Sequence, residues 1–113
     1  MQNEDALAKS VGKAIAKRRT SIGLKQEEVA EKLGIGLEAM SRMERGVVIP
    51  TITRMMQLSE IFGCSTADLV QEASYRPTDQ AMYITDLLTK LADEDRTMLV
   101  GMIEQLAARL QKS

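Results

Sequence analysis

The residues best suited to contact chemistry lie in one short segment, IGLEAMSRMERG, at positions 35–46. One side of it carries polar side chains that make directional hydrogen bonds: Glu38, Ser41, Arg42 and Arg45. An arginine can grip guanine N7 and O6 with two hydrogen bonds, and a glutamate can accept one from cytosine N4. An aliphatic side chain such as Leu37 can pack against a thymine methyl. The segment therefore has the side chains of a helix that contacts nucleic-acid bases.

Catalytic and metal-binding chemistry is poorly supported. The chain has no histidine, which is the commonest general base and a frequent metal ligand. Its one cysteine, Cys64, excludes a disulfide framework and a multi-cysteine zinc site; we expect it to be a buried small hydrophobe and not a redox sensor. The acids at 93–95 suit the first turn of a helix. We predict no enzyme activity, no catalytic residue, no metal and no cofactor.

Positive charge is concentrated around this segment. Of the 113 residues, those from 9 to 46 include nine Lys or Arg and five acids, although the whole chain has a net charge of -1. A basic region of this kind matters more for a nucleic-acid partner than the total charge does. The candidates for contact with phosphates are cationic side chains in and around it: Lys9, Lys13, Lys17, Lys25, Lys32, Arg45 and Arg54.

Helical spacing of apolar residues, with few prolines and no strand-like alternation, predicts an all-α protein. Glycines and capping residues divide it into seven expected helices, at about 8–22, 25–33, 37–45, 51–62, 65–70, 79–91 and 94–111. Thr51, Ser65 and Asp93 are the expected caps of three of them. The first five form a compact bundle, and the last two form a C-terminal extension after a boundary at 74–78.

The expected buried side chains follow from the same spacing. On the first helix they are Val11, Ala14, Ile15, Arg18 and Ile22, and on the second Val29, Ala30 and Leu33. On the fourth they are Ile52, Met55, Met56, Leu58, Ser59 and Phe62. In the third, Met40 and Met43 lie opposite the polar side.

The stretch from Gln26 to Arg45 has the pattern of a helix-turn-helix. A small residue, Ala30, stands where two helices must cross closely, and Gly34 stands where the chain must turn sharply. Such a motif holds its second helix away from its own domain, so that the outer side can enter the DNA major groove.

The sequence resembles the phage-repressor-like, or XRE-type, helix-turn-helix regulators over about residues 9–71. The matching pieces are LKQEEVAEKLG, SRMERG, the proline four residues after Gly46, and FGCSTADL. The resemblance implies that Gln26 hydrogen-bonds a DNA phosphate and that Arg19 and Glu44 form a partly buried ion pair. The sequence departs from the family around Gly36 to Glu38 and in the apolar connector VVI at 47–49, which leaves the operator sequence open.

We name the residues expected to meet bases the reading face: Gly36, Leu37, Glu38, Ser41 and Arg42. Arg42 is the strongest candidate for a base contact, with a phosphate contact as its alternative. Phosphate contacts are expected chiefly from Gln26, Lys25 and Arg45.

The two helices expected beyond residue 78 each carry an apolar side, which must pack against another surface to be shielded from water. The two options are a fold back onto the bundle and pairing with a second copy, and we favour pairing. We therefore predict a DNA-binding domain at 9–71 and a helical dimerisation extension at 78–111. The expected function is a homodimeric, cytoplasmic transcription regulator, a repressor that binds a palindromic operator in double-stranded DNA, with no membrane association.

Two alternatives remain. An antitoxin would use the same motif for autoregulation and its C-terminal helices to bind a toxin as protein partner. A helix-turn-helix used only for protein interaction would suit the acidic Glu38 and the pI near 5.5.

Overall fold

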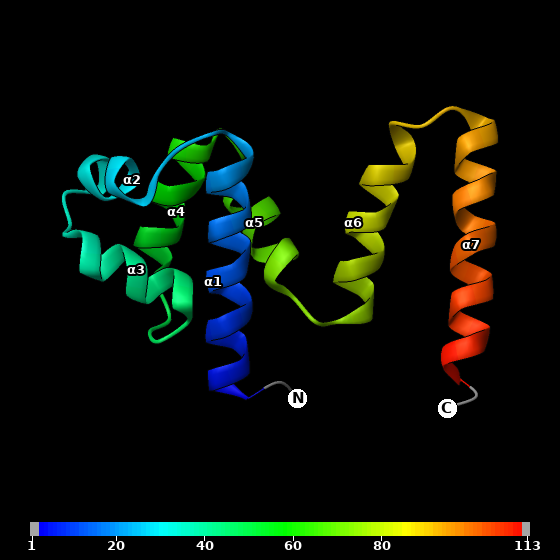
Figure 1. Ribbon diagram of the computed structural model, residues 1–113, viewed down its shortest axis with the longest axis horizontal. Helices are drawn as coiled ribbons and strands as arrows, with labels where there is room; N and C mark the ends of the chain where they lie inside the picture. The colour runs from blue at the N-terminus through cyan, green and yellow to red at the C-terminus, as the bar shows by residue number, and fades with distance from the viewer. Residues whose placement is uncertain (1–2, 112–113) are drawn as a thin grey trace. The chain divides into compact units, whose positions relative to one another are not determined.

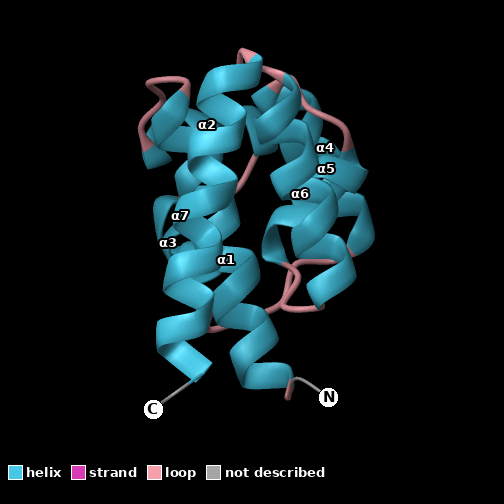
Figure 2. Ribbon diagram, turned by 90° about the vertical axis from the view of Figure 1, so that its right-hand side faces the viewer, coloured by secondary structure: helices cyan, strands magenta, loops and turns pink. Residues whose placement is uncertain are grey.

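The computed structural model describes residues 3–111, and that range consists of helices joined by loops, without a strand (Figures 1 and 2). The all-α prediction is confirmed. The helices are α1 (Glu4–Ser21), α2 (Gln26–Leu33), α3 (Leu37–Arg45), α4 (Ile52–Phe62), α5 (Thr66–Ala73), α6 (Pro77–Thr89) and α7 (Asp93–Gln111). The chain divides into two compact units, Met1–Gln80 and Ala81–Ser113.

The first unit is built around one hydrophobic core to which α1 to α5 all contribute. The most deeply buried side chains are Ile15, Val29, Met40, Leu58 and Leu69. Helix α1 contacts α3, α4 and α5, and α2 contacts α3 and α4, so the two helices of the motif are each held by at least two neighbours. This core fixes α3 from its inner side and leaves its outer side to solvent.

Three apolar residues that were expected inside are exposed. Ile22, Ile52 and Met56 lie in solvent, Ile52 with an exposed fraction of 77%. Ile22 lies past the end of α1, so no helical turn follows it, and Ile52 is the first residue of α4, so no helical turn precedes it. Met56 lies next to the buried Met55, on the side of α4 that faces away from the bundle.

Several helix boundaries also differ from the prediction. α1 begins at Glu4 instead of residue 8, because Asn3 Oδ1 accepts a hydrogen bond from the Ala6 N–H at 2.7 Å and the first turn is acidic. Lys25 precedes α2 in extended conformation instead of opening it. At the C-terminal side, α6 begins at Pro77 and α7 begins at Asp93, which is a helical residue and not the cap.

Two polar contacts tie α5 to α1 across a long stretch of sequence. The Ser10 hydroxyl donates to the Ala73 carbonyl, and Arg18 Nη2 lies 2.5 Å from Glu72 Oε1. Burial works against the charge on Arg18, but the hydrogen bond and charge of Glu72 outweigh it and raise the pKa of Arg18. Cys64, which was expected to be buried, is only partly buried against the core, and burial raises the pKa of its thiol.

Helices α1 and α3 approach each other so closely that a side chain would not fit between them. A Cβ atom on Gly12 would lie 2.5 Å from the Glu44 carbonyl oxygen and 2.6 Å from that of Met43. At the end of α3, a Cβ on Gly46 would lie 2.5 Å from Lys9 Cα, and Gly46 has a positive φ of 75°. Glycine is therefore required at both positions where α3 lies against α1.

The second unit has no buried core in the part that the structure describes. No residue of α6 or α7 is buried, and apart from their turn the two helices make few close backbone contacts. The turn is held by Arg96, which donates to the Leu88 and Leu91 carbonyls at 3.1 and 2.9 Å. None of the described helices is long and apolar enough to span a membrane.

Candidate nucleic-acid interface

The turn between α2 and α3 has the geometry that the motif requires. Gly34 ends α2 in the left-handed conformation, with φ 72°. The Ile35 N–H then bonds the Ala30 carbonyl at 3.0 Å, and Ala30 is buried where α2 meets α3. Gly36 lies just before α3 in extended conformation and is exposed. The small residue and the glycine thus bring the two helices together within a very short connection.

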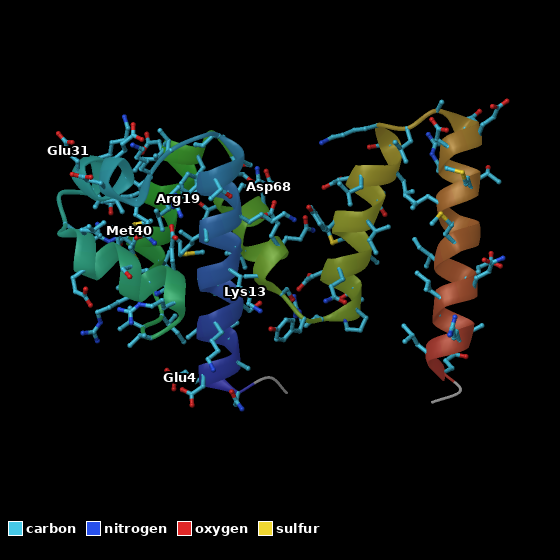
Figure 3. The ribbon with its side chains drawn as sticks, viewed as in Figure 1. Glu4, Lys13, Arg19, Glu31, Met40 and Asp68 are labelled. Carbon is cyan, nitrogen blue, oxygen red and sulfur yellow. The ribbon has the colours of Figure 1, made fainter. Side chains whose placement is uncertain are left out.

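Helix α3 is fastened to α1 by the ion pair between Arg19 and Glu44. Arg19 Nε lies 2.6 Å from Glu44 Oε2, and Arg19 Nη2 lies 3.0 Å from Glu44 Oε1. The exposed fractions of the two side chains are 14% and 5%. The hydrogen bonds to Glu44 raise the pKa of Arg19, against the opposing effect of burial. Arg19 (labelled in Figure 3) also donates to the Leu24 carbonyl at 2.8 Å, in the loop that leads to α2.

Gln26, the first residue of α2, is part of the same cluster. Its Nε2 donates to Glu44 Oε1 at 2.9 Å, and its side chain is half-buried. The backbone N–H groups of Gln26 and Glu27 have no hydrogen-bond partner among the described residues, because the first turn of a helix leaves such groups unpaired. The start of α2 therefore combines free N–H groups and a fixed amide, an arrangement that suits an anion.

The reading face lies on the outer side of α3. Gly36, Leu37, Glu38 and Arg42 are exposed, and Ser41 is half-buried. Met40, labelled in Figure 3, is on the inner side and fully buried, and Met43 is buried with it. The structure thus brings the predicted base-contacting residues together on one solvent-facing side.

Arg45 and Glu38 are paired in the free protein. Arg45 Nη2 lies 3.2 Å from Glu38 Oε1, and Arg45 Nε donates to the Ser41 hydroxyl at 3.2 Å. Both charged side chains are more than half exposed. An exposed pair of this kind is worth about 0–1 kcal/mol, so DNA could displace it at little cost. The side chain of Arg42 makes no hydrogen bond or ion pair with the described residues, although its backbone carbonyl accepts from the Val47 N–H.

An open groove of about 440 Å³ runs beside the reading face. Its lining is mostly apolar, from Ile35, Ala39, Met43 and Val48, with Glu38, Arg42 and Arg54 as its charged members. Arg54 is oriented by Gln57 Oε1 at 3.0 Å. Two guanidinium groups therefore line the same groove, one from α3 and one from α4.

The lysines expected at phosphates are all exposed, and they come from two helices and the loop between them: Lys9, Lys13 and Lys17 on α1, Lys25 before α2, and Lys32 on α2. Lys9 is placed by its contact with Gly46 at the end of α3. Among the described residues, no group of acids and Cys64 is arranged to hold a metal ion.

Three features of the site were not predicted from the sequence: Gly12, the Gln26–Glu44 hydrogen bond, and the groove beside Arg42. Gly12 carried a signal, because a glycine inside a helix costs about 1 kcal/mol and calls for a packing reason. The hydrogen bond and the groove depend on tertiary placement of α2 and α4, for which spacing along the chain gives no signal.

Comparison with known proteins gives consistent matches. A family model described as "Helix-turn-helix" matches residues 15–69. The chain is 32% identical to the HTH-type transcriptional regulator ImmR of Bacillus subtilis, over 91% of this chain and 86% of that protein. It is 34% identical to an uncharacterized HTH-type transcriptional regulator, y4dJ, of Sinorhizobium fredii, over 70% of this chain and 96% of that protein.

Among solved structures, the clp gene regulator ClgR from Corynebacterium glutamicum has a similar fold. The TM-score is 0.59 at 23% sequence identity, over 74% of this chain and 87% of that chain. The family is one of regulators and not of enzymes. With its Gly34 turn, buried α3 inner side and exposed outer side, this chain belongs to the XRE-type helix-turn-helix transcriptional regulators, which bind DNA.

Proposed function

We propose that this protein is a transcriptional repressor that binds a palindromic operator as a homodimer in the cytoplasm, where the DNA is. The observation that carries the proposal is the arrangement of α3. Its inner side is fixed by Met40, Met43 and the Arg19–Glu44 pair, while the reading face is left free to solvent. A helix held in this way can enter the major groove without rearrangement of the domain. Repression follows if the occupied operator overlaps the site of the polymerase.

The homodimer is supported by the second unit. Helices α6 and α7 expose many large apolar side chains: Met82, Ile84, Leu87, Met98, Val100, Met102, Ile103 and Leu106. A stable pair of helices needs a partner that covers such a surface. We call α6, α7 and the turn between them the α6–α7 hairpin. The hairpin of a second copy offers the same apolar surface, and a twofold axis lets each hairpin cover the other. Residues 78–111 are thus the proposed dimerisation element, and residues 9–71 the DNA-binding domain.

Replacing Leu106 with glutamate is expected to convert the dimer to a monomer, because a charge would be placed in the surface between the two hairpins. Light scattering coupled to gel filtration measures the mass. Gln105→Glu is the matched control, since it adds the same side chain one position away and should leave the dimer intact. If Leu106→Glu still has the mass of a dimer, the hairpin is not the dimerisation element.

The same variant tests the palindrome. Two recognition helices of a dimer reach successive major grooves about 34 Å apart. We expect footprinting of the protein's own promoter to show two protected half-sites with this spacing. Linked binding of two half-sites strengthens affinity by about 10²–10⁴-fold, so Leu106→Glu should lose much of it while α1 to α5 stay folded. A footprint with a single half-site for the wild type would rule out the palindromic dimer.

Arg42→Ala is expected to relax sequence preference at one base pair by about 1–3 kcal/mol, because one bidentate contact to guanine would be lost. The measurement compares the affinity of wild type and variant for operators altered at single base pairs. The position of Arg42 in the groove with Arg54 leaves phosphate as its alternative partner. An equal loss of affinity on every sequence would assign Arg42 to phosphate.

A second candidate function is binding of another protein, and specific residues favour it. Leu37 on the reading face is exposed, and so is the connector Val47 to Ile49 that follows α3, whereas DNA interfaces are more polar than protein interfaces. An antitoxin would instead cover its α6–α7 hairpin with a toxin. A toxin reading frame beside this one, and a stable complex of the two products in place of a homodimer, would favour that function over an operator-bound homodimer.

A further inference from the structure

We propose that Glu44 is a positioning residue for the phosphate contact of Gln26, and that Arg19 neutralises Glu44 so that a phosphate can approach. The proposal rests on the proposed DNA-binding function. It assigns to the ion pair a role in binding besides its role in holding α3.

The side-chain amide of Gln26 is held in position by Glu44. Glu44 Oε1 receives Arg19 Nη2 at 3.0 Å and Gln26 Nε2 at 2.9 Å, so one carboxylate oxygen joins side chains from α1 and α2 to α3. A glutamine has two amide N–H groups, and this contact uses one of them. The other N–H is then held in place relative to α3, on the first residue of α2, whose own backbone N–H is unpaired. A phosphate that binds Gln26 would therefore contact a side-chain N–H whose position relative to the reading face is already fixed.

The negative charge of Glu44 is neutralised by Arg19. A carboxylate within hydrogen-bond distance of a phosphate-binding amide would repel the phosphate if it were unpaired. Arg19 contacts both oxygens of Glu44, so the pair as a whole is close to neutral. The Arg19 guanidinium also donates to the Leu24 carbonyl in the loop just before α2. Arg19 thus neutralises the charge of Glu44 and also holds the loop that leads into α2.

A double-mutant cycle on DNA affinity separates this role from a purely structural one. The wild type, Gln26→Ala, Glu44→Gln, Glu44→Ala and both Glu44 variants in the Gln26→Ala background are titrated with promoter DNA. Each concentration is corrected for the folded fraction, measured by circular dichroism in the same buffer. Gln26→Ala should weaken binding by about 13- to 160-fold, the worth of one hydrogen bond to a charged group. The loss should be equal on all operator variants and should leave the salt slope unchanged, because glutamine carries no charge.

Glu44→Gln keeps an oxygen that can accept from Gln26, so we expect affinity per folded molecule within about twofold of the wild type. Glu44→Ala should weaken binding by a larger factor when Gln26 is present than in the Gln26→Ala background, where only the weaker attachment of α3 to α1 remains to affect it. If Glu44→Ala does not fold, the joint replacement of Arg19 by Met and Glu44 by Leu takes its place in both backgrounds, because it leaves no unpaired charge buried. It should likewise weaken binding by a larger factor when Gln26 is present than when Gln26 is alanine.

The proposal is overturned if the Glu44 substitutions weaken DNA binding by the same factor with and without Gln26, since Glu44 would then act independently of it. It is also overturned if Gln26→Ala leaves affinity unchanged while the wild type binds. Failure of the wild type itself to bind promoter DNA is a different result, which removes the proposed function along with this inference.

Discussion

Glu44→Ala is expected to lower the free energy of unfolding by about 3–5 kcal/mol, the cost of leaving one partner of a buried ion pair without the other. Both side chains are mostly buried, at 14% and 5% exposure, so solvent can do little for the guanidinium of Arg19 that remains. The loss should also free the Gln26 amide and weaken the attachment of α3 to α1. Urea denaturation at neutral pH measures the change.

Glu38→Ala is the matched control for this prediction. Glu38 also belongs to α3 and also contacts an arginine, Arg45, but both side chains of this pair lie in solvent. An exposed pair is worth about 0–1 kcal/mol, so stability should change little. Joint replacement of Arg19 and Glu44 by Met and Leu should recover part of the loss, because no unpaired charge is then buried. Equal effects of Glu44→Ala and Glu38→Ala would show that the Arg19–Glu44 pair does not hold α3.

Gly12→Ala is expected to destabilise the protein by about 1–3 kcal/mol, although alanine is the better helix former. The added methyl would lie 2.5 and 2.6 Å from the carbonyl oxygens of Glu44 and Met43, which belong to the backbone of α3 and cannot rotate away. α3 must therefore shift from α1, and the reading face shifts with it. Thermal unfolding measures the loss of stability, and promoter affinity per folded molecule should fall as well.

The chain contains a matched control in α7. Gly101 is also inside a helix, but a Cβ there would meet no atom within 4 Å. Gly101→Ala should therefore raise stability by up to about 1 kcal/mol, the ordinary gain in helix propensity. If Gly12→Ala and Gly101→Ala both stabilise the protein, the close approach of α1 and α3 does not constrain the fold.

Much of the fold could be predicted because residues at the ends of the helices themselves determine where most helices begin and end. Gly34, Gly46 and Gly63 each end a helix with a positive φ, and Thr51 and Ser65 each cap the helix that follows. These are effects of adjacent residues, and the sequence shows them directly. The exposed Ile52 and Met56 show the limit of periodicity, because an apolar residue indicates an inner side only if another element lies over it.

The candidate site was predicted only where neighbouring residues decide the local structure. The pattern around Ala30 and Gly34 predicted which helix would turn its outer side to solvent. The side-chain pairings across the fold were not all predicted. The hydrogen bond of Gln26 with Glu44, which helps to hold α3, and the ion pair of Arg18 with Glu72, which joins α1 to α5, are examples. A carboxylate and an arginine far apart in sequence have many possible partners, and only the packing of α1 against α3 and α5 selects among them. The base preference of the reading face remains a prediction.

The central claim is that the basic region and α3 bind DNA through phosphates and base edges. Titration of the protein with its own promoter DNA at several salt concentrations tests it most directly. Affinity should fall by about 0.9 log units per log unit of salt for each phosphate neutralised. Lys25→Ala should therefore reduce the slope by about 0.9, the contribution of one phosphate contact. Absence of binding at low salt, or an affinity that does not change with salt, would contradict the claim and favour a protein-interaction module.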